Sequence, residues 1–522
     1  MARVGSAGRM AAIAVAATLV MATAAALVDA RAGTVDRAAA VSAKPNIVML
    51  MTDDQTLRDL AVMPRTRRSI GQAGVTFSRD FASYPLCCPS RATLLTGRYA
   101  HNHGVRSNKP PNGGYGRLDK ANTLPVWLQR SGYTTAHIGK YLNGYGRDVP
   151  ADVPPGWSEW SGSIDGSTYL MWGYTLNENG TPRTYGAVNV EDPALYQTDV
   201  YRAKAVDFIR RRAGQGRPFY LSVAFLAPHA ESARKRREIS VRPAPRHRGR
   251  FASEPLPRPP SFDEADVSDK PSFIRSAPRL TAAQVRRISR NYRARQESLL
   301  AVDEAVEAIV GALHETGSLG RTYVLFTSDN GFFHGEHRVP QGKYLVYDAS
   351  SHLPLLIRGP GIPAGKTSGE LVSNVDLAPT IVAAAGARPS KPMDGRSLLA
   401  FARDARKRST RPILHEGLAP SAAGDNEQDG TAPSAAPGAA ASALPGYAAV
   451  RTSRFLYVEY FTTTDRELYD LAKDPYELRS LQRDRRYGRT RIALARDLAR
   501  LRRCAGPACS ASRPAPPGPT VR

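Results

Sequence analysis

Short uninterrupted runs of apolar residues alternate along the chain with segments whose apolar residues recur at helical spacing. Four runs have the length and composition of strands that are buried on both faces: residues 46–51, 133–138, 219–225 and 322–326. A helix-like stretch at 123–130 precedes the second run, and a longer amphipathic segment, apolar from Leu299 to Leu313, precedes the fourth. Alternating helices and buried strands predict an open α/β sheet with parallel strands.

Polar residues follow each of these predicted strands. In chain order they are Asp53 with Asp54, then Lys140, then His229, then Asp329 with Asn330, and Lys343 lies shortly beyond the last pair. Open α/β sheets bind ligands outside the carboxyl ends of their strands. We therefore expect these widely separated residues to share one cleft.

The remaining segments indicate an insertion and a smaller second unit. Residues 230–282 are rich in Pro, Arg and Ser without apolar periodicity, which predicts a long surface insertion. Residues 418–446 consist mainly of Ala, Gly, Pro and Ser and are expected to be a disordered loop. Beyond them, residues 447–460 and 467–471 predict strands of a C-terminal subdomain, and a basic helix is expected near 489–503.

The N-terminus has the pattern of an export signal. Arg3 and Arg9 precede an apolar run at 10–28, and Ala30-Arg31-Ala32 supplies small residues for cleavage, so we predict a signal peptide at 1–32. The mature protein is then expected to be secreted or held in the cell envelope, with no stable membrane partner. The alternative is an uncleaved membrane anchor, because the run is nearly long enough to span a bilayer.

The chain has four cysteines, and they form two kinds of pair. Cys504 and Cys509 lie close together in a tail with Pro and Gly, where an oxidising compartment favours a small disulfide. Cys87 and Cys88 are adjacent, and neighbouring residues bridge each other only with strained geometry. This second pair requires another explanation.

The net charge is +25, from 72 Lys and Arg against 47 Asp and Glu. Such a field attracts polyanions, whether nucleic acids, anionic surfaces or sulfated glycans. A solvated arginine-rich surface is an equally simple interpretation. No nucleic-acid-binding module is recognisable in the sequence, and export argues against such a partner, so we expect none.

The sequence LCCPSRATLLTGR at residues 86–98 contains C-x-P-S-R followed by x-x-x-L-T-G. On this signature, and on the motifs around the polar residues named above, the chain resembles the sulfatase family over roughly residues 44–485. The resemblance implies an alkaline-phosphatase-like α/β/α sandwich with a large mixed, mostly parallel sheet, and a smaller C-terminal α+β subdomain with an antiparallel sheet. The expected boundaries are 44–390 for the catalytic domain, 391–503 for the subdomain and 504–522 for a tail.

The same resemblance implies that Cys87 is oxidised to formylglycine by a formylglycine-generating enzyme. One hydroxyl of the hydrated aldehyde would attack the sulfate sulfur, and the second would let the covalent sulfate be expelled with the aldehyde restored. A serine would instead remain as a stable sulfate ester. Cys88 is then an incidental neighbour.

The resemblance also suggests roles for the polar residues after the strands. Oxygen donors suit a hard cation, so Asp53, Asp54, Asp329 and Asn330, with the converted Cys87, are expected to bind Ca²⁺ in preference to Mg²⁺. Arg91 resembles the family arginine that holds the formylglycine and the metal ligands. Lys140 and Lys343 resemble sulfate-binding lysines, and His229 or Lys343 would protonate the leaving alcohol.

One position departs from the family pattern. Many arylsulfatases have a histidine two residues after the lysine that matches Lys140, and it is thought to deprotonate the hydrate in the final step. Leu142 occupies this position here. Asn143, His101 and His103 are the alternatives for this role.

Several motifs, among them KYLN at 140–143 and VPPGW at 153–157, look most like the N-acetylglucosamine-6-sulfatase branch. The expected substrate is a sulfated glycan such as 6-O-sulfated N-acetylglucosamine. The alternatives are an arylsulfatase of broad specificity acting on aryl sulfates, a phosphomonoester or phosphonate hydrolase of the same superfamily, and a polyanion-binding protein without catalysis. The intact nucleophile and metal positions argue against the last of these.

Overall fold

A computed structural model describes residues 44–231, 240–418 and 444–520. The predicted signal peptide, part of the basic insertion and most of the predicted disordered loop lie outside the described residues. Among the described residues, no helix combines the length and the apolar character that a bilayer span requires.

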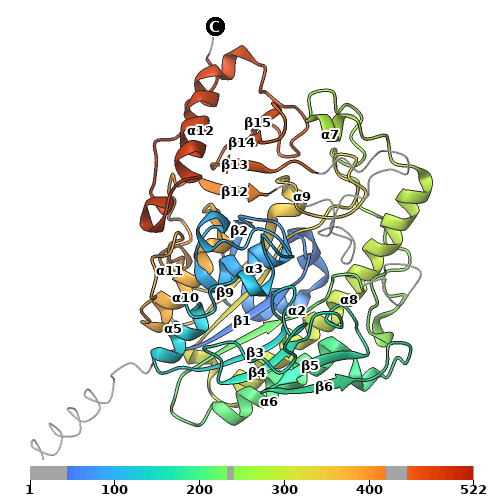
Figure 1. Cartoon of the computed structure of the whole chain (residues 1–522), viewed down its shortest axis with the longest axis vertical. Helices are drawn as coiled ribbons and strands as arrows, with labels where there is room; N and C mark the ends of the chain where they lie inside the picture. The colour runs from blue at the N-terminus through green and yellow to red at the C-terminus, as the bar shows by residue number, and fades with distance from the viewer. Residues whose placement is uncertain (1–43, 232–239, 419–443, 521–522) are drawn as a thin grey trace, which may run out of the picture. The chain divides into compact units, whose positions relative to one another are not determined.

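The main body is built on a mixed sheet of 11 strands (Figure 1). Its strands lie in the order β10-β2-β9-β8-β1-β7-β3-β4-β5-β6, and β11 pairs with β2. Their bounds are β1 Asn46–Thr52, β2 Val75–Phe81, β3 Thr134–Lys140, β4 Glu159–Ser163, β5 Tyr174–Glu178, β6 Thr181–Tyr185, β7 Phe219–Ala224, β8 Thr322–Ser328, β9 His352–Arg358, β10 Lys366–Ser368 and β11 Val372–Ser373.

The central strands β8, β1, β7, β3 and β4 are parallel, whereas β9 joins β2 and β8 antiparallel and β4–β6 form an antiparallel edge. The four apolar runs are β1, β3, β7 and β8, which confirms the α/β sheet. Antiparallel β9 interrupts the parallel order because only the short helix α9 (Asp348–Ser351) precedes it, and no long crossover helix returns the chain.

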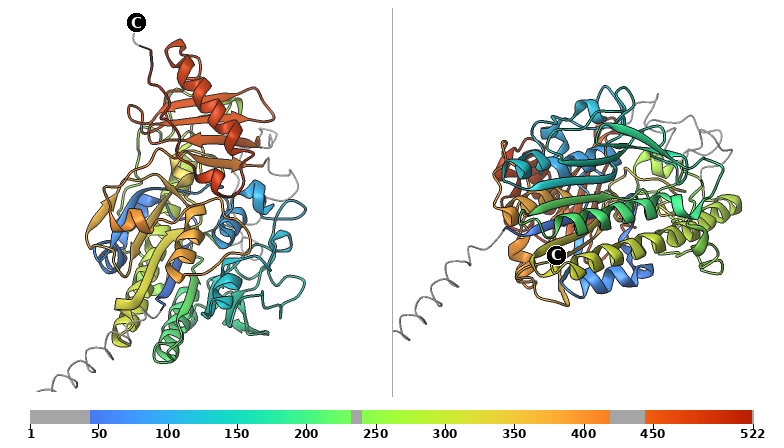
Figure 2. Two further views of the ribbon diagram at one scale, coloured as in Figure 1. Left: turned by 90° about the vertical axis from the view of Figure 1, so that its left-hand side faces the viewer. Right: turned by 90° about the horizontal axis from the view of Figure 1, so that it is seen from below.

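The large sheet is covered on both faces. Along β1, Ile47, Met49 and Met51 enter one core, and Val48 and Leu50 enter the other. Helices α5 (Leu124–Arg130), α10 (Leu377–Ala385) and α11 (Leu399–Arg403) contribute to the first core, and α6 (Gln197–Arg212) and α8 (Ala282–Glu315) to the second. Figure 2 shows α6 and α8 side by side on one face. Burial on both faces explains why β1 is continuously apolar.

Apart from α3 (Cys87–Thr96), which carries the signature, and the C-terminal helix α12 (Gly488–Leu501), the remaining helices are short. They are α2 Pro64–Thr66, α4 Ala100–His103, α7 Ser272–Arg275 and the turns η1 Leu57–Val62, η2 Arg67–Gly71, η3 Tyr115–Arg117, η4 Pro193–Leu195, η6 Pro245–His247, η7 Leu319–Arg321, η8 Asn374–Asp376, η9 Arg485–Tyr487 and η10 Gly506–Ser510. Helix α8 starts well before its apolar stripe, at a capping box between Thr281 and Gln284. The described part of the predicted insertion packs against the body and buries Ala244, Leu256 and Ile274.

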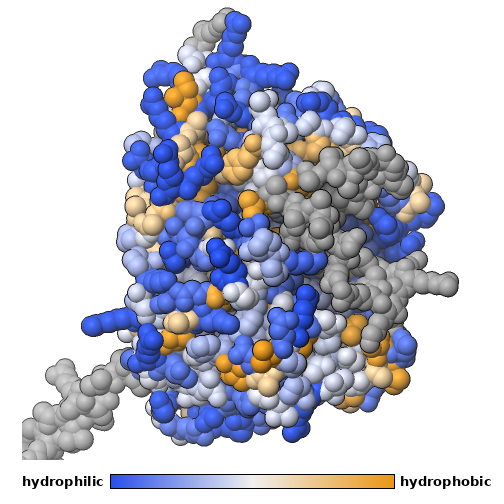
Figure 3. Space-filling model, viewed as in Figure 1, coloured by the Kyte–Doolittle hydropathy of each residue, from blue (hydrophilic) through white to orange (hydrophobic). Residues whose placement is uncertain are grey.

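A second sheet of four antiparallel strands follows, in the order β12-β13-β14-β15. Its strands are β12 Ile413–Gly417, β13 Tyr447–Arg451, β14 Phe455–Tyr460 and β15 Arg466–Asp470, and α12 (Gly488–Leu501) packs on it through Leu494, Leu498 and Leu501. This confirms the small antiparallel sheet and the basic helix, while β12 precedes the region where the sequence indicated strands. The face drawn in Figure 3 is mainly hydrophilic, with small scattered apolar patches.

A buried ion pair joins the two sheets. Asp376, in η8 beside the large sheet, accepts hydrogen bonds from both terminal nitrogens of Arg411, at 2.7 and 2.5 Å, just before β12. Both side chains are 0% exposed. Removing one partner of such a pair leaves the other charge buried without compensation.

We therefore expect Arg411→Ala to lower the free energy of unfolding by about 3–5 kcal/mol, measured by urea denaturation. Arg406→Ala is the control, because the Arg406 side chain is 96% exposed. Its effect should stay within about 0.5 kcal/mol. Equal midpoints for the two variants would show that the pair does not stabilise the junction.

Candidate active site

The polar residues that follow the strands do meet at one edge of the large sheet. Asp53 and Asp54 follow β1, Lys140 ends β3, and Asp329 and Asn330 follow β8. His229 comes after β7, in the turn where its backbone N–H donates to Leu226. Lys343 lies in the loop before α9, and all seven side chains are buried.

Helix α3 brings the signature residues to this edge. It begins at Cys87 and ends at Thr96, and the following Gly97 adopts a left-handed conformation with φ 65°. Cys87 and Arg91 are four residues apart and therefore lie on one face of the helix. Ser90 fixes the helix against β8, because its hydroxyl donates to the carbonyl oxygen of Asp329 at 2.5 Å and accepts from the Asn374 amide at 2.9 Å.

The two adjacent cysteines have different surroundings. The Cys87 thiol lies 2.7 Å from Nζ of Lys343 and 3.7 Å from Oδ1 of Asp53. Cys88 belongs to the apolar core, and its backbone N–H donates to Asn108 at 3.0 Å. Only Cys87 therefore faces the charged cluster.

Three basic side chains pair with three carboxylates in this cluster. Arg91 donates to Asp329 at 2.8 Å and to Asp53 at 3.2 Å. Lys140 also donates to Asp53. Lys343 donates to Asp54 at 2.5 Å and lies 3.9 Å from Asp53. Formally, the three positive charges of the protein balance its three negative charges.

These neighbours change the acidity of the buried groups. Burial alone would raise the pKa of Asp53, but the positive charges around it, that of Lys140 first, hold its pKa below the ordinary value. The pKa of Asp54 is likewise lowered against burial, chiefly by Lys343. Burial and the charge of Asp53 raise the pKa of Asp329. Burial also raises the pKa of the Cys87 thiol, so the cysteine itself is a poor nucleophile here.

The donor set fits a hard divalent cation. Among the described residues, Asp53, Asp54, Cys87 and His229 form a group whose ligand atoms lie within 4.8 Å of one another. Oδ1 of Asn330 is buried beside them without a hydrogen-bond partner in the described chain. Its amide nitrogen is held by Asp54 at 2.6 Å, which orients this oxygen. A buried oxygen without a hydrogen-bond donor, next to carboxylates, is suited to coordinate a hard cation.

His229 belongs to the same group, although the sequence indicated only a role toward the leaving alcohol. Its Nδ1 lies 2.6 Å from the carbonyl oxygen of Ala230 and so carries the hydrogen. Its Nε2 points to Asp54, 3.6 Å from Oδ2. Burial lowers the pKa of His229, which keeps the ring neutral.

Two residues of the site were missed by sequence reasoning. Arg295 of α8 donates to the backbone carbonyl groups of Asp54 and Pro228, and so holds the ends of β1 and β7 together. A charged residue four positions before Leu299, on the apolar face of the helix, was the signal that could have revealed it. Tyr169 lies with its ring 4.6 Å from Nζ of Lys140 and 4.9 Å from the ring of His229, and no sequence pattern marked it.

Comparisons with known proteins agree with this geometry. The sequence model of the family described as Sulfatase matches residues 45–387. Human N-acetylglucosamine-6-sulfatase is 34% identical over 504 residues, covering 90% of this chain and 87% of the human protein. The chain belongs to the sulfatase family. It is therefore an enzyme that hydrolyses sulfate esters.

Solved structures share the fold of this sulfatase. One, of a protein in complex with its substrate D-glucosamine-2-N,6-O-disulfate, has a TM-score of 0.71 at 23% identity and covers 87% of this chain and 97% of its own. The phosphonate monoester hydrolase of Agrobacterium radiobacter has a TM-score of 0.62 at 24% identity, covering 88% and 95%. At these identities the likeness concerns the fold, which hosts both chemistries.

The three residues considered in place of a histidine at Leu142 lie in different settings. Leu142 itself is part of the apolar core. His103 is enclosed by Thr93 and the backbone N–H of Val105, and burial lowers its pKa to about 3. Asn143 lines a small pocket together with Tyr169, whose ring also contacts Lys140.

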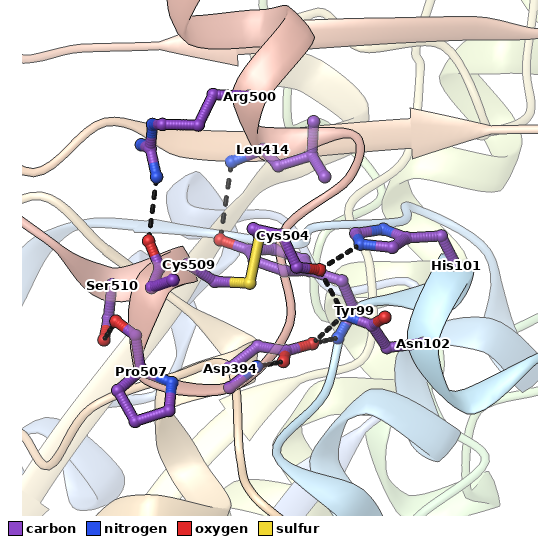
Figure 4. The surroundings of a disulfide bond; sticks show 12 residues. Tyr99, His101, Asn102, Asp394, Leu414, Arg500, Cys504, Pro507, Cys509 and Ser510 are labelled. Atoms are coloured by element: carbon purple, nitrogen blue, oxygen red, sulfur yellow. Dashed lines mark hydrogen bonds between the residues drawn. A yellow bond between two sulfur atoms is a disulfide. The ribbon is translucent and has the colours of Figure 1, made fainter.

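His101 instead connects the sulfatase body to the C-terminal disulfide (Figure 4). Cys504 and Cys509 are bonded, which confirms the predicted bridge. The ring of His101 lies 2.9 Å from Glu416 through Nδ1 and 2.9 Å from the carbonyl oxygen of Cys504 through Nε2. Both partners are acceptors, so both ring nitrogens must carry hydrogen and neither can act as a base.

A protonated His101 makes stability depend on pH. Burial disfavours the charged ring, but the hydrogen bond to Glu416 raises the pKa of His101 above its ordinary value. A raised pKa stabilises the fold fully below the unfolded value of about 6.5, and this stabilisation is lost as pH rises through the folded value.

We therefore expect His101→Gln to destabilise the protein more near pH 6 than near pH 9, measured as the free energy of unfolding. His314→Gln is the control, because His314 is exposed at the end of α8. A difference between wild type and His101→Gln that is constant over this range would contradict the protonated assignment.

Proposed function

We propose that this sulfatase removes 6-O-sulfate groups from N-acetylglucosamine residues of glycans, with Cys87 as the precursor of a formylglycine nucleophile. The observation that carries the proposal is the position of Cys87 at the start of α3, in contact with Lys343 and beside Asp53. The 34% identity to human N-acetylglucosamine-6-sulfatase supports the substrate. Sulfated glycans also suit the net charge of +25.

The thiol cannot perform this reaction as it stands. Its pKa is raised by burial, and a sulfur nucleophile would provide no second hydroxyl to expel the sulfate. Conversion to the aldehyde by a formylglycine-generating enzyme is a two-electron oxidation of the Cys87 β-carbon. The C–S bond breaks, the sulfur leaves as hydrogen sulfide, an oxygen atom takes its place, and an oxidant used by the converting enzyme accepts the two electrons. The hydrated aldehyde supplies two hydroxyl groups at the position of the present thiol.

Asp53, Asp54, Asp329, Asn330 and the converted Cys87 would bind one divalent cation. We favour Ca²⁺ over Mg²⁺, because a buried set of protein oxygens leaves little room for the water that Mg²⁺ retains. When bound, the cation would polarise the sulfate and favour the ionised nucleophile. Arg91 positions the set through Asp53 and Asp329.

The lysines supply fixed positive charge for the sulfate oxygens. Lys140 and Lys343 approach the Cys87 position from β3 and from the loop before α9. Their carboxylate partners raise the pKa of both amines, so both stay charged and can stabilise developing negative charge. Lys343, which already donates toward Cys87 at 2.7 Å, would provide the proton for the leaving alcohol. His229 is the alternative donor, but its ring is neutral with the hydrogen on Nδ1, so it would first have to take up a proton at Nε2.

The remaining proposals concern maturation and organisation. A signal peptide at 1–32 would export the chain, so that the enzyme acts outside the cell or in its envelope. Residues 44–390 would form the catalytic domain, with 391–503 as the C-terminal subdomain and 504–522 as its tail. A glycan of the extracellular space is consistent with this location.

The nucleophile assignment predicts different results for the two cysteines. In protein expressed with the converting enzyme, Cys87→Ala should lose sulfate release from N-acetylglucosamine-6-sulfate to background. Cys88→Ala should keep most of it, because Cys88 faces the apolar core. Released sulfate is measured by ion chromatography, and the residue 87 peptide by mass spectrometry.

A phosphate monoester of the same sugar serves as the matched substrate. The fold also hosts phosphonate hydrolysis, so faster release of phosphate than of sulfate by the wild type would refute the sulfate assignment. Full activity in Cys87→Ala, or a thiol at residue 87 in fully active wild type, would refute the nucleophile. Activity on aryl sulfates alone would refute the proposal that the substrate is a sulfated glycan.

A further inference from the structure

The small pocket lined by Asn143 lies next to the charged cluster and has no role in the proposed chemistry. Its volume is about 140 Å³, and its walls come from two loops, residues 108–116 and 143–148, together with Asp165 and Tyr169. The first loop follows α4, and the second follows Lys140 at the end of β3. The second loop therefore leaves directly from a residue of the charged cluster.

The pocket shares a wall with the active site. Asn108 lines it and also accepts the backbone N–H of Cys88, beside the nucleophile position, at 3.0 Å. The Tyr169 ring lines it and contacts Lys140 and His229 on the catalytic side. A molecule whose sulfate reaches Lys140 would thus have its next atoms at this pocket.

Asn143 presents an unused acceptor here. Its amide nitrogen donates to the hydroxyl of Tyr169 at 2.8 Å, which fixes the orientation of the amide. Its Oδ1 is buried and has no hydrogen-bond partner in the described chain. A buried amide oxygen left without a donor is costly, so a ligand with an N–H or O–H group would be stabilised there.

Of the four charged side chains among the described residues that line the pocket, two are paired with each other and two are not. Arg147 and Asp165 neutralise each other through a contact of 2.8 Å. Asp148 is exposed at the rim. Lys109 is half-buried, and within residues 44–231, 240–418 and 444–520 no ion pair or hydrogen bond of its ammonium group is found. Two charges of the lining therefore lack an ion pair within the described chain, Lys109 on the half-buried part of the wall and Asp148 at the exposed rim.

We propose that this pocket binds the sugar ring that carries the scissile sulfate, and that Lys109 selects rings with a second anionic group. Asn143 accepts a hydrogen bond from an amide or hydroxyl donor of the ring, and Tyr169 borders the ring on the side that faces Lys140. This proposal rests on the proposed function. It adds that glucosamine carrying both N-sulfate and 6-O-sulfate is preferred over N-acetylglucosamine-6-sulfate.

The test compares kcat/KM for these two saccharides in formylglycine-bearing enzyme. Wild type should prefer the doubly sulfated sugar, and Lys109→Ala should reduce that preference about fivefold, mainly through KM, as expected for loss of one partly exposed ion pair. Asn143→Ala should raise KM for both sugars and leave the preference in place. Lys366→Ala is the control, because Lys366 is exposed on β10, at the far edge of the sheet from β3.

The outcomes separate this proposal from the one on which it rests. If wild type cleaves both saccharides and Lys109→Ala keeps the wild-type preference, the pocket assignment is wrong while the sulfatase function stands. If wild type prefers glucosamine 6-sulfate, which carries a free amine, then Asp148 and Asp165 determine the selectivity of the pocket, and the role proposed for Lys109 is overturned. Release of sulfate from aryl sulfates only would overturn both proposals.

Discussion

The structure depends on keeping three carboxylates, Asp53, Asp54 and Asp329, together in a buried space. Buried charges of one sign require compensation, and Arg91, Lys140 and Lys343 provide it from three different parts of the chain. The six formal charges cancel. A divalent cation would add two positive charges, which a singly charged sulfate ester and one ionised nucleophile oxygen would balance. This balance of charge is what the proposed binding of a metal and a sulfate monoester together would require.

The fold meets this constraint by ending its central strands at one place. Parallel β1, β3, β7 and β8 deliver residues separated by more than 250 positions along the chain to adjacent strand ends, as the hydrogen bond between Asp54 and Asn330 illustrates. Arg295 then fixes two of those ends through their carbonyl groups. Outside the site, the Arg411–Asp376 pair and the His101 contacts join the C-terminal sheet and its disulfide to the same framework.

The sequence predicted the parts of this arrangement that have a local pattern. Strands buried on both faces produce continuous apolar runs, so β1, β3, β7 and β8 could be recognised. The signature located the candidate nucleophile, but no helix was predicted over residues 87–96. The strands β2 and β9 were not predicted, because their pairing depends on contacts distant in sequence. The contact between Tyr169 and Asn143 could not be predicted either, because only the folded loops bring the tyrosine hydroxyl to the amide. The sequence could not show that His101 contacts Cys504, because the two residues are 403 positions apart. For this reason His101 was considered as a possible base.

The most direct test of the central claim is metal binding by the purified protein after removal of divalent ions. Calorimetric titration with Ca²⁺, checked by elemental analysis, should show one ion bound per chain in wild type and a loss of binding in Asn330→Ala. Asn291→Ala is the matched control, because Asn291 lies on α8 and its amide donates to Gln341 and not to a residue of the cluster. Binding that is absent from wild type, or equal in wild type and Asn330→Ala, would contradict the account of the carboxylate cluster as a metal centre.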